Sequence, residues 1–149
     1  MELMRNLLGR FPKQFFSAAT LILILWLTLA PKPLGEETPH LFPGADKVVH
    51  GLMFGFLVLM ILLDWKRKNE WHPTSWKRVA AAITFSAALG AFIEVCQLEM
   101  NMGRGFEWGD IIADSAGALV CGTVWLYAQN LRSETSMHKK EDAGRREHK

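Results

Sequence analysis

The sequence has few of the features that mark soluble enzymes. Its 149 residues include two cysteines, Cys96 and Cys121, and one tyrosine. Both cysteines lie in hydrophobic stretches, which favours buried small side chains over a disulfide or a redox pair. No serine or cysteine has a recognisable nucleophile context, and the signatures of acid phosphatases, rhomboid proteases and zincins are absent. There is no visible internal repeat, and the length allows one compact domain.

Long apolar stretches are what the sequence does have. A membrane-spanning helix needs about 20 residues, with a lower limit near 17. Four stretches reach this length when their interfacial flanks are included: 15–30, 48–63, 79–98 and 111–128. We therefore predict an all-α fold, a membrane-embedded bundle of four transmembrane helices. It occupies residues 15–130, between an N-terminal arm (1–14) and a charged tail (131–149).

The positions of Lys and Arg predict the orientation of this bundle. Of 17 such residues, 14 fall in the N-terminal arm, in the loop after the second stretch and in the tail. Positive residues are retained in the cytoplasm, so both termini are predicted to be cytoplasmic. The tail mixes charges of both signs, and we expect a solvated, partly disordered segment that does not bind nucleic acid.

The first thirty residues have a competing interpretation as a secretory signal, because a basic region precedes an apolar run. The potential cleavage site is poor, since Thr28 is larger than the preferred alanine and Pro31 follows the run. Cleavage would remove the first span and leave the rest of the topology unchanged.

Ionisable side chains in three of the spans are the main functional signal. Charges in hydrocarbon cost roughly 2.5–3.5 kcal/mol each on insertion scales, so they pair, face a cavity or serve a function. In the second span, helical spacing places Asp46, Lys47 and His50 on one face. Asp46 also suits a helix N-cap, and Lys47 can reach the surface. His50 lies one turn inside, beside a G-x-x-x-G pattern (Gly51, Gly55) that favours close helix approach.

The third span carries Glu94 and Gln97, with Ser86 and Gly90 extending the same stripe inward. We interpret Glu94 as part of a ligand-binding or proton-handling site. A role in holding helices together by hydrogen bonds is the alternative.

The predicted outer loop and fourth span complete the set. Arg104 is the only cation of a glycine-rich loop, and its guanidinium suits a carboxylate or a phosphate. It can equally pair with Glu94, Glu107 or Asp110 within the protein. Asp110 and Asp114 share one helical face, and only Asp110 can be explained as an N-cap.

In this order and spacing, the residues resemble the VanZ-like family of bacterial integral membrane proteins. The matching pattern covers residues 46–122 and consists of Asp46-Lys47-x-x-His50, Glu94-x-x-Gln97, Gly103-Arg104, and Asp110 with Asp114-x-x-Gly117. The family commonly has Asn where Asp114 stands here. The resemblance implies a cell-envelope protein of the bacterial cytoplasmic (inner) membrane. The family is associated with low-level resistance to the glycopeptide teicoplanin.

Negative charge predominates on the predicted outer side, where three cations face eight carboxylates. Some carboxylates must therefore pair or take up protons. A divalent cation held by His50 with Glu94, Asp110 or Asp114 is a lesser alternative, because the spans contain no H-x-x-x-H or H-x-x-E pair. We predict no metal and no other cofactor.

Two functional hypotheses follow. In the first, a non-enzymatic envelope protein binds membrane lipids or lipid-linked cell-wall intermediates in an outward-facing polar pocket. The pocket comprises Asp46, Lys47, His50, Glu94, Gln97, Arg104, Asp110 and Asp114. In the second, the protein is an intramembrane hydrolase or transferase. His50 would act as general base or acid, Glu94 or Asp110 would orient it, and Arg104 with Lys47 would hold an anionic centre. The sequence leaves the oligomeric state open.

Overall fold

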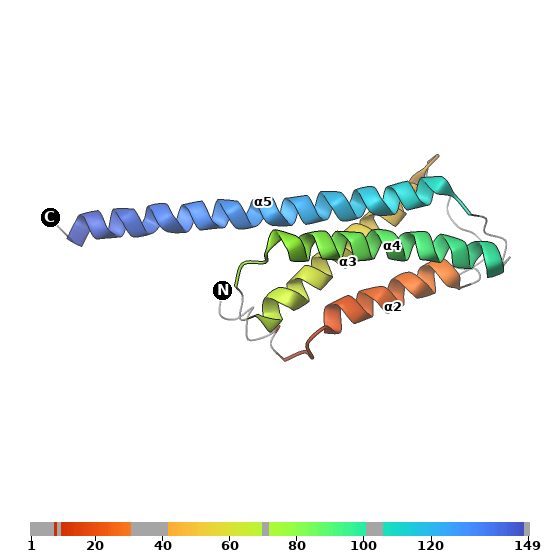
Figure 1. Ribbon diagram of the computed structural model, residues 1–149, viewed down its shortest axis with the longest axis horizontal. Coiled ribbons are helices and arrows are strands. Elements are labelled where there is room, and N and C mark those ends of the chain that lie inside the picture. The colour runs from red at the N-terminus through yellow and green to blue at the C-terminus, as the bar shows by residue number, and fades with distance from the viewer. Residues whose placement is uncertain (1–7, 9, 31–41, 70–71, 101–105, 148–149) are drawn as a thin grey trace.

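The structure is a computed structural model of the 149-residue chain, and it describes residues 8, 10–30, 42–69, 72–100 and 106–147. The described part is helical, with side chains described up to residue 135. Four helices carry the labels of Figure 1, and they are α2 (Phe15–Leu29), α3 (Ala45–Lys68), α4 (Trp76–Met100) and α5 (Trp108–Glu147). The predicted all-α bundle of four helices is confirmed.

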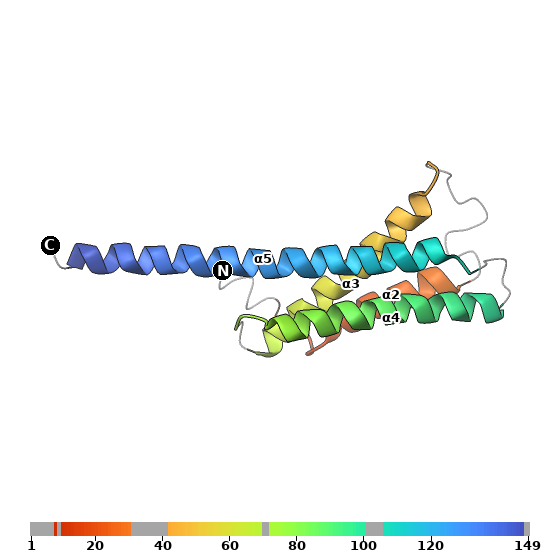
Figure 2. The same ribbon diagram turned by 45° about the horizontal axis from the view of Figure 1, so that its top comes forward.

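The helices alternate in direction, so segments far apart in sequence meet at the same end of the bundle. The end of α2, the start of α3, the end of α4 and the start of α5 lie together at one end (Figure 1). Helix α3 crosses the bundle obliquely and packs most extensively against α5 (Figure 2). This arrangement brings His50 of α3, Glu94 of α4, and Asp110 and Asp114 of α5 to one end.

The outer surface of the bundle is apolar. Exposed large hydrophobic side chains occur on all four helices, and they include Leu23, Phe56, Phe92 and Leu119. Contiguous apolar surface of this extent suits contact with lipid, not water. Three helices, α3, α4 and residues 108–135 of α5, are long and apolar enough to cross a membrane. Helix α2 is apolar but shorter, with 15 residues.

The interior contains two packed apolar clusters. One lies between α2, α3 and α4 and is formed by Ile24, Phe54, Leu57 and Ile93. The other lies between α3, α4 and α5 and contains Val58, Leu62, Val79, Ala82 and Ala118. Neither cluster includes His50, Glu94, Asp110 or Asp114.

Two predictions about helix starts are wrong. Gly44, with φ of 83°, is the N-cap of α3, and Asp46 lies in the first turn with no capping hydrogen bond from the N-cap position. Glycine adopts this left-handed conformation without steric strain, so it can end the preceding loop. Helix α5 already begins at Trp108, so Asp110 lies within its first turn. Both aspartates still lie near the positive end of a helix dipole, which favours a carboxylate.

The charged tail also differs from expectation. We expected a partly disordered segment after residue 130, whereas α5 continues without a break to Glu147. Figure 1 shows this extension projecting well past the other helices. The tail contains many Lys, Arg and Glu residues, which have good helix propensity, and it follows a helix that is already formed.

Candidate functional site

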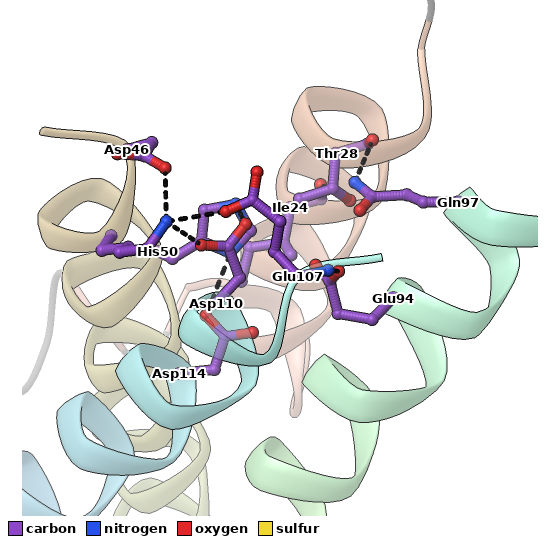
Figure 3. Close-up of polar contacts among 10 residues, drawn as sticks. Ile24, Thr28, Asp46, His50, Glu94, Gln97, Glu107, Asp110 and Asp114 are labelled. Atoms are coloured by element: carbon purple, nitrogen blue, oxygen red, sulfur yellow. Dashed lines mark hydrogen bonds and ion pairs between the residues drawn. The ribbon is translucent and has the colours of Figure 1, made fainter. Parts of the chain in front are cut away.

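A close crossing of α3 and α5 positions the centre of the site. A Cβ atom on Gly117 would collide with the backbone of Gly51, and one on Gly55 would lie 2.9 Å from the carbonyl oxygen of Gly117. The two backbones are therefore in direct contact, as the G-x-x-x-G pattern predicted. Directly beside this crossing, His50 of α3 faces Asp114 and Asp110 of α5 (Figure 3).

His50 and Asp114 form a buried hydrogen bond. His50 Nδ1 lies 3.1 Å from Asp114 Oδ1, and the two residues are 8% and 1% exposed. When the Asp114 carboxylate is ionised it can only accept, and His50 Nδ1 then carries the proton and donates it. The Asp114 side chain fits because Gly90 of α4 has none, since a Cβ atom there would lie 2.5 Å from Asp114 Oδ2. Asp114 therefore holds the imidazole ring in one orientation. In this orientation Nε2 lies on the side of Asp110.

The second imidazole nitrogen faces the carboxylate of Asp110 at a distance beyond hydrogen bonding. His50 Nε2 is 3.8 Å from Asp110 Oδ2, which is longer than a hydrogen bond. Ligating atoms of His50, Asp110 and Glu94 all lie within 4.8 Å of one another, and all three residues are buried. Helices α3, α4 and α5 thus each contribute one potential ligand atom, and these atoms are close enough together to surround a single ion.

Glu94 is the most deeply buried of the acidic residues along with Asp114, at 1% exposure. Its Oε2 accepts a hydrogen bond of 2.9 Å from the backbone N–H of Glu107, in the segment before α5. Among the described residues, its Oε1 has no hydrogen-bond partner. An unsatisfied buried acceptor costs about 1–3 kcal/mol, and more when it is charged. The structure therefore leaves a carboxylate oxygen free where it is energetically expensive.

Lys47 lies at the rim of the site and connects three carboxylates. Its Nζ is 2.9 Å from Asp46 Oδ2, 2.8 Å from Glu107 Oε2 and 3.3 Å from Asp110 Oδ1. The Lys47 side chain is 39% exposed, and its aliphatic part passes over Gly109, where a Cβ atom would collide with it. Lys47 therefore compensates part of the negative charge at the mouth of the site.

Not all predicted site residues are in this cluster. The Gln97 side chain turns to α2, where Nε2 donates a 2.9 Å hydrogen bond to the carbonyl oxygen of Thr28 (Figure 3). Arg104 lies in 101–105, outside the described residues. Asp46 belongs to the exposed rim, with its side chain 54% exposed. The role of orienting His50, which we assigned to Glu94 or Asp110, is filled by Asp114.

One contributor was missed as a site residue. We considered Glu107 only as a partner of Arg104, but its backbone N–H binds Glu94 and its side chain binds Lys47. Its position three residues before Asp110, at the start of the fourth span, was the available signal. Within the described part of the site, five carboxylates (Asp46, Glu94, Glu107, Asp110 and Asp114) surround one lysine and one histidine.

A second buried polar cluster lies at the opposite end of α3 and was not predicted. Asp64, which is 4% exposed, accepts hydrogen bonds from the backbone N–H of Ser17 at 2.8 Å and from its hydroxyl at 2.9 Å. Arg67 Nη1 donates to the other Asp64 oxygen at 2.8 Å. Arg67 also binds the carbonyl oxygens of Leu8 and Phe11 and lies over the ring of Phe16. This cluster joins α2 and the preceding segment to α3.

Comparison with known proteins identifies a family. A model of the VanZ/LLP1 family matches residues 6–129. This match is wider than residues 46–122, on which the resemblance rested, and it includes α2. No curated protein and no solved structure matches the chain.

Proposed function

The chain belongs to the VanZ/LLP1 family of membrane proteins, and on this premise we propose that it binds an amphiphilic component of the bacterial cell envelope. The bound group is the head group of a lipid or of a lipid-linked wall intermediate. It enters the polar cluster of His50, Glu94, Asp110 and Asp114 from the end of the bundle where Lys47 lies. The tails of such an amphiphile would lie along the exposed apolar faces of the helices.

The observation that carries the proposal is the unpartnered Oε1 of Glu94. Most buried polar atoms in protein interiors have a hydrogen-bond partner, and the described residues include six buried side-chain atoms without one. Glu94 Oε1 is distinguished by its position, because it belongs to a 1% exposed carboxylate close to His50, whose Nε2 is 3.8 Å from Asp110 Oδ2, beyond hydrogen-bond distance. Groups left in this state are most simply explained as partners of a ligand.

The charge of the cluster restricts the head group. Lys47 is already engaged with three carboxylates. A bare phosphate would therefore meet net negative charge and be repelled. A head group bearing an ammonium, or a phosphate accompanied by a cation, would be accepted.

The distribution of Lys and Arg along the chain bears on which side of the membrane the site faces. Fourteen of 17 Lys and Arg residues fall in the N-terminal arm, in the loop after α3 and in the tail, and the described parts of these segments lie at the end of the bundle opposite to the site. By the positive-inside rule, this distribution supports an orientation in which both termini are cytoplasmic and the site lies on the outer side of the cytoplasmic membrane. Reporter fusions after Lys149 should then behave as internal, and those in the 31–43 loop as external. If the bound group is a lipid-linked wall intermediate, deletion of the protein should change susceptibility to glycopeptides such as teicoplanin.

Lipid mass spectrometry on the detergent-purified protein tests the proposal. We expect wild type to retain a defined lipid species and His50→Ala to lose it. His72→Ala is the matched control, because His72 is exposed and lies in the segment between α3 and α4, at the other end of the bundle. Identical lipid profiles for wild type and His50→Ala would contradict the proposal.

A second candidate is an intramembrane hydrolase or transferase. The specific observation in its favour is the Asp114–His50 pair, since a carboxylate on Nδ1 leaves Nε2 available as a general base. Among the described residues no serine or cysteine contacts the pair, so the nucleophile would be water or a substrate hydroxyl. Release of phosphate from polyprenyl phosphates by wild type, abolished in His50→Gln, would favour the enzyme. No release by wild type would remove it.

A further inference from the structure

We propose that His50, Glu94 and Asp110 bind a divalent first-row transition metal ion. This inference rests on the proposed function, because it identifies how a site rich in carboxylates receives an anionic head group. The sequence favoured no metal, since the spans lack the local histidine pairs of common metal motifs. The three ligands come instead from α3, α4 and α5, so no local motif could reveal them.

The spacing of the three groups suits a single ion. A metal bound at about 2.0–2.2 Å by nitrogen and oxygen ligands holds neighbouring ligand atoms roughly 3–4 Å apart. The distance between His50 Nε2 and Asp110 Oδ2 is 3.8 Å, too long for a hydrogen bond and within this range. All three ligand atoms lie within 4.8 Å of one another, so side-chain adjustments of under about 1 Å complete the site.

Each proposed ligand is held from behind by a different outer group. Asp114 accepts from His50 Nδ1, which leaves Nε2 as the ligating nitrogen. The Glu107 backbone N–H binds Glu94 Oε2, which leaves Oε1 without a partner. Lys47 contacts Asp110 Oδ1, which leaves Oδ2 facing the imidazole. A carboxylate on the far nitrogen of a ligating histidine is a recurrent arrangement in metal sites, and it orients the ring.

The ion would also resolve the charge imbalance of the site. An added charge of +2 offsets two of the buried carboxylates, which otherwise repel one another in a medium of low dielectric constant. With three protein ligands, a zinc-type ion keeps an open coordination position. A phosphate oxygen of an amphiphile can occupy that position, where the cluster alone would repel it. Imidazole with two carboxylates favours zinc or manganese over calcium.

The test uses the full-length protein purified in detergent and stripped with a chelator. Zinc and manganese are added separately, with calcium as comparison, and binding is measured by calorimetry, by elemental analysis after desalting and by the thermal shift. We expect one equivalent of zinc or manganese to bind and to raise the unfolding temperature. Asp110→Asn and Glu94→Gln should weaken binding by at least about tenfold, and Asp114→Asn by about 10–100-fold.

Two controls keep the result interpretable. His72→Gln removes an exposed histidine far from the site and should bind zinc as wild type does. Asp114→Asn retains the side-chain volume, and an unchanged elution volume from gel filtration verifies that the variant is folded. The metal site would be overturned if wild type bound neither zinc nor manganese. It would also be overturned if Asp110→Asn and Glu94→Gln bound the metal as tightly as wild type does.

Lipid retention separates this inference from the proposed function. If the same lipid species is retained in chelator and in zinc, the amphiphile binds without a metal and only the present inference fails. If zinc binds with the predicted variant pattern but no defined lipid is retained in either condition, the metal site stands and the proposed function fails. The combined account predicts a defined lipid in zinc and its loss in chelator.

Discussion

Helix α3 carries a buried carboxylate cluster near each end, and the two clusters are built differently. At one end, both oxygens of Asp64 are bound, one by Arg67 and the other by the backbone and hydroxyl of Ser17. At the other end, His50 faces Asp110 and Asp114, and the nearby Glu94 keeps a free oxygen. The first cluster balances one carboxylate with one guanidinium, whereas the second has a surplus of negative charge.

The hydrogen-bond partners and charge balance of a buried cluster distinguish a structural role from a ligand-binding role better than burial or cavity size does. Asp64 and Asp114 are both buried, at 4% and 1% exposure. A cavity of about 450 Å³ adjoins Asp64, lined by side chains of α2, α3 and α4. Yet both oxygens of the Asp64 carboxylate are hydrogen-bonded to protein groups, whereas among the described residues Glu94 Oε1 has no hydrogen-bond partner. We infer that the Asp64 cluster stabilises the fold and that the Glu94 cluster binds a ligand.

The largest expected effect is on stability, at the Asp64 cluster. Asp64→Ala leaves the guanidinium of Arg67, whose side chain is 8% exposed, without its carboxylate. Removing one partner of a buried ion pair costs about 3–5 kcal/mol. We expect a large fall in the thermal unfolding temperature in detergent and in membrane abundance. Glu99→Ala is the control, because Glu99 is exposed on α4. A variant as stable as wild type would show that the Asp64 cluster is not structural.

The second-largest effect is expected at the close crossing of α3 and α5. In Gly117→Ala, the added methyl group collides with the backbone of Gly51, which forces α3 and α5 apart. Overpacking of this kind costs about 1–3 kcal/mol. It should also weaken ligand or metal binding, because His50 moves away from Asp114. Ala116→Ser, at an exposed neighbouring position, should change neither property. Unaltered stability and binding in Gly117→Ala would contradict the close crossing.

A smaller effect is expected at Gln97, which the structure separates from the ligand site. Gln97→Leu removes the hydrogen bond to the Thr28 carbonyl, a loss of about 0.5–1.5 kcal/mol. Lipid and metal retention should remain at the wild-type level. If retention falls while the unfolding temperature changes little, Gln97 belongs to the binding site after all.

Hydrophobic length and helical spacing account for how much of the fold could be predicted. The apolar stretches locate all four helices, because lipid-facing segments must be both long and apolar. Charge in a hydrophobic segment identified His50, Glu94 and Asp114, because burial of such groups is otherwise unfavourable. These signals are local, and they were sufficient for the elements and for three of the side chains that the structure brings close together.

The errors arose where the outcome depends on a neighbouring helix. Glu94 and Gln97 are three residues apart, so their directions differ by about 60° around the helix. That difference is enough for Glu94 to face the start of α5 and for Gln97 to face α2. Asp64 was missed because it lies at the end of the second apolar stretch, close to Lys66 and Arg67. A charged residue in such a position is usually exposed, so it did not indicate a buried site. Its burial depends on Ser17 of α2, which sequence spacing cannot reveal.

The most direct measurement concerns Glu94→Gln, which retains the acceptor for the Glu107 backbone N–H and removes the unpaired charge. Thermal stability and lipid retention are measured together on the purified variant, with Glu99→Gln as an exposed control on the same helix. If the Glu94 cluster binds a ligand, the unfolding temperature without ligand should stay equal or rise, since a buried charge without a partner is removed. Retention of the defined lipid should be lost. Wild-type retention, or a loss of stability parallel to the loss of lipid, would contradict the account.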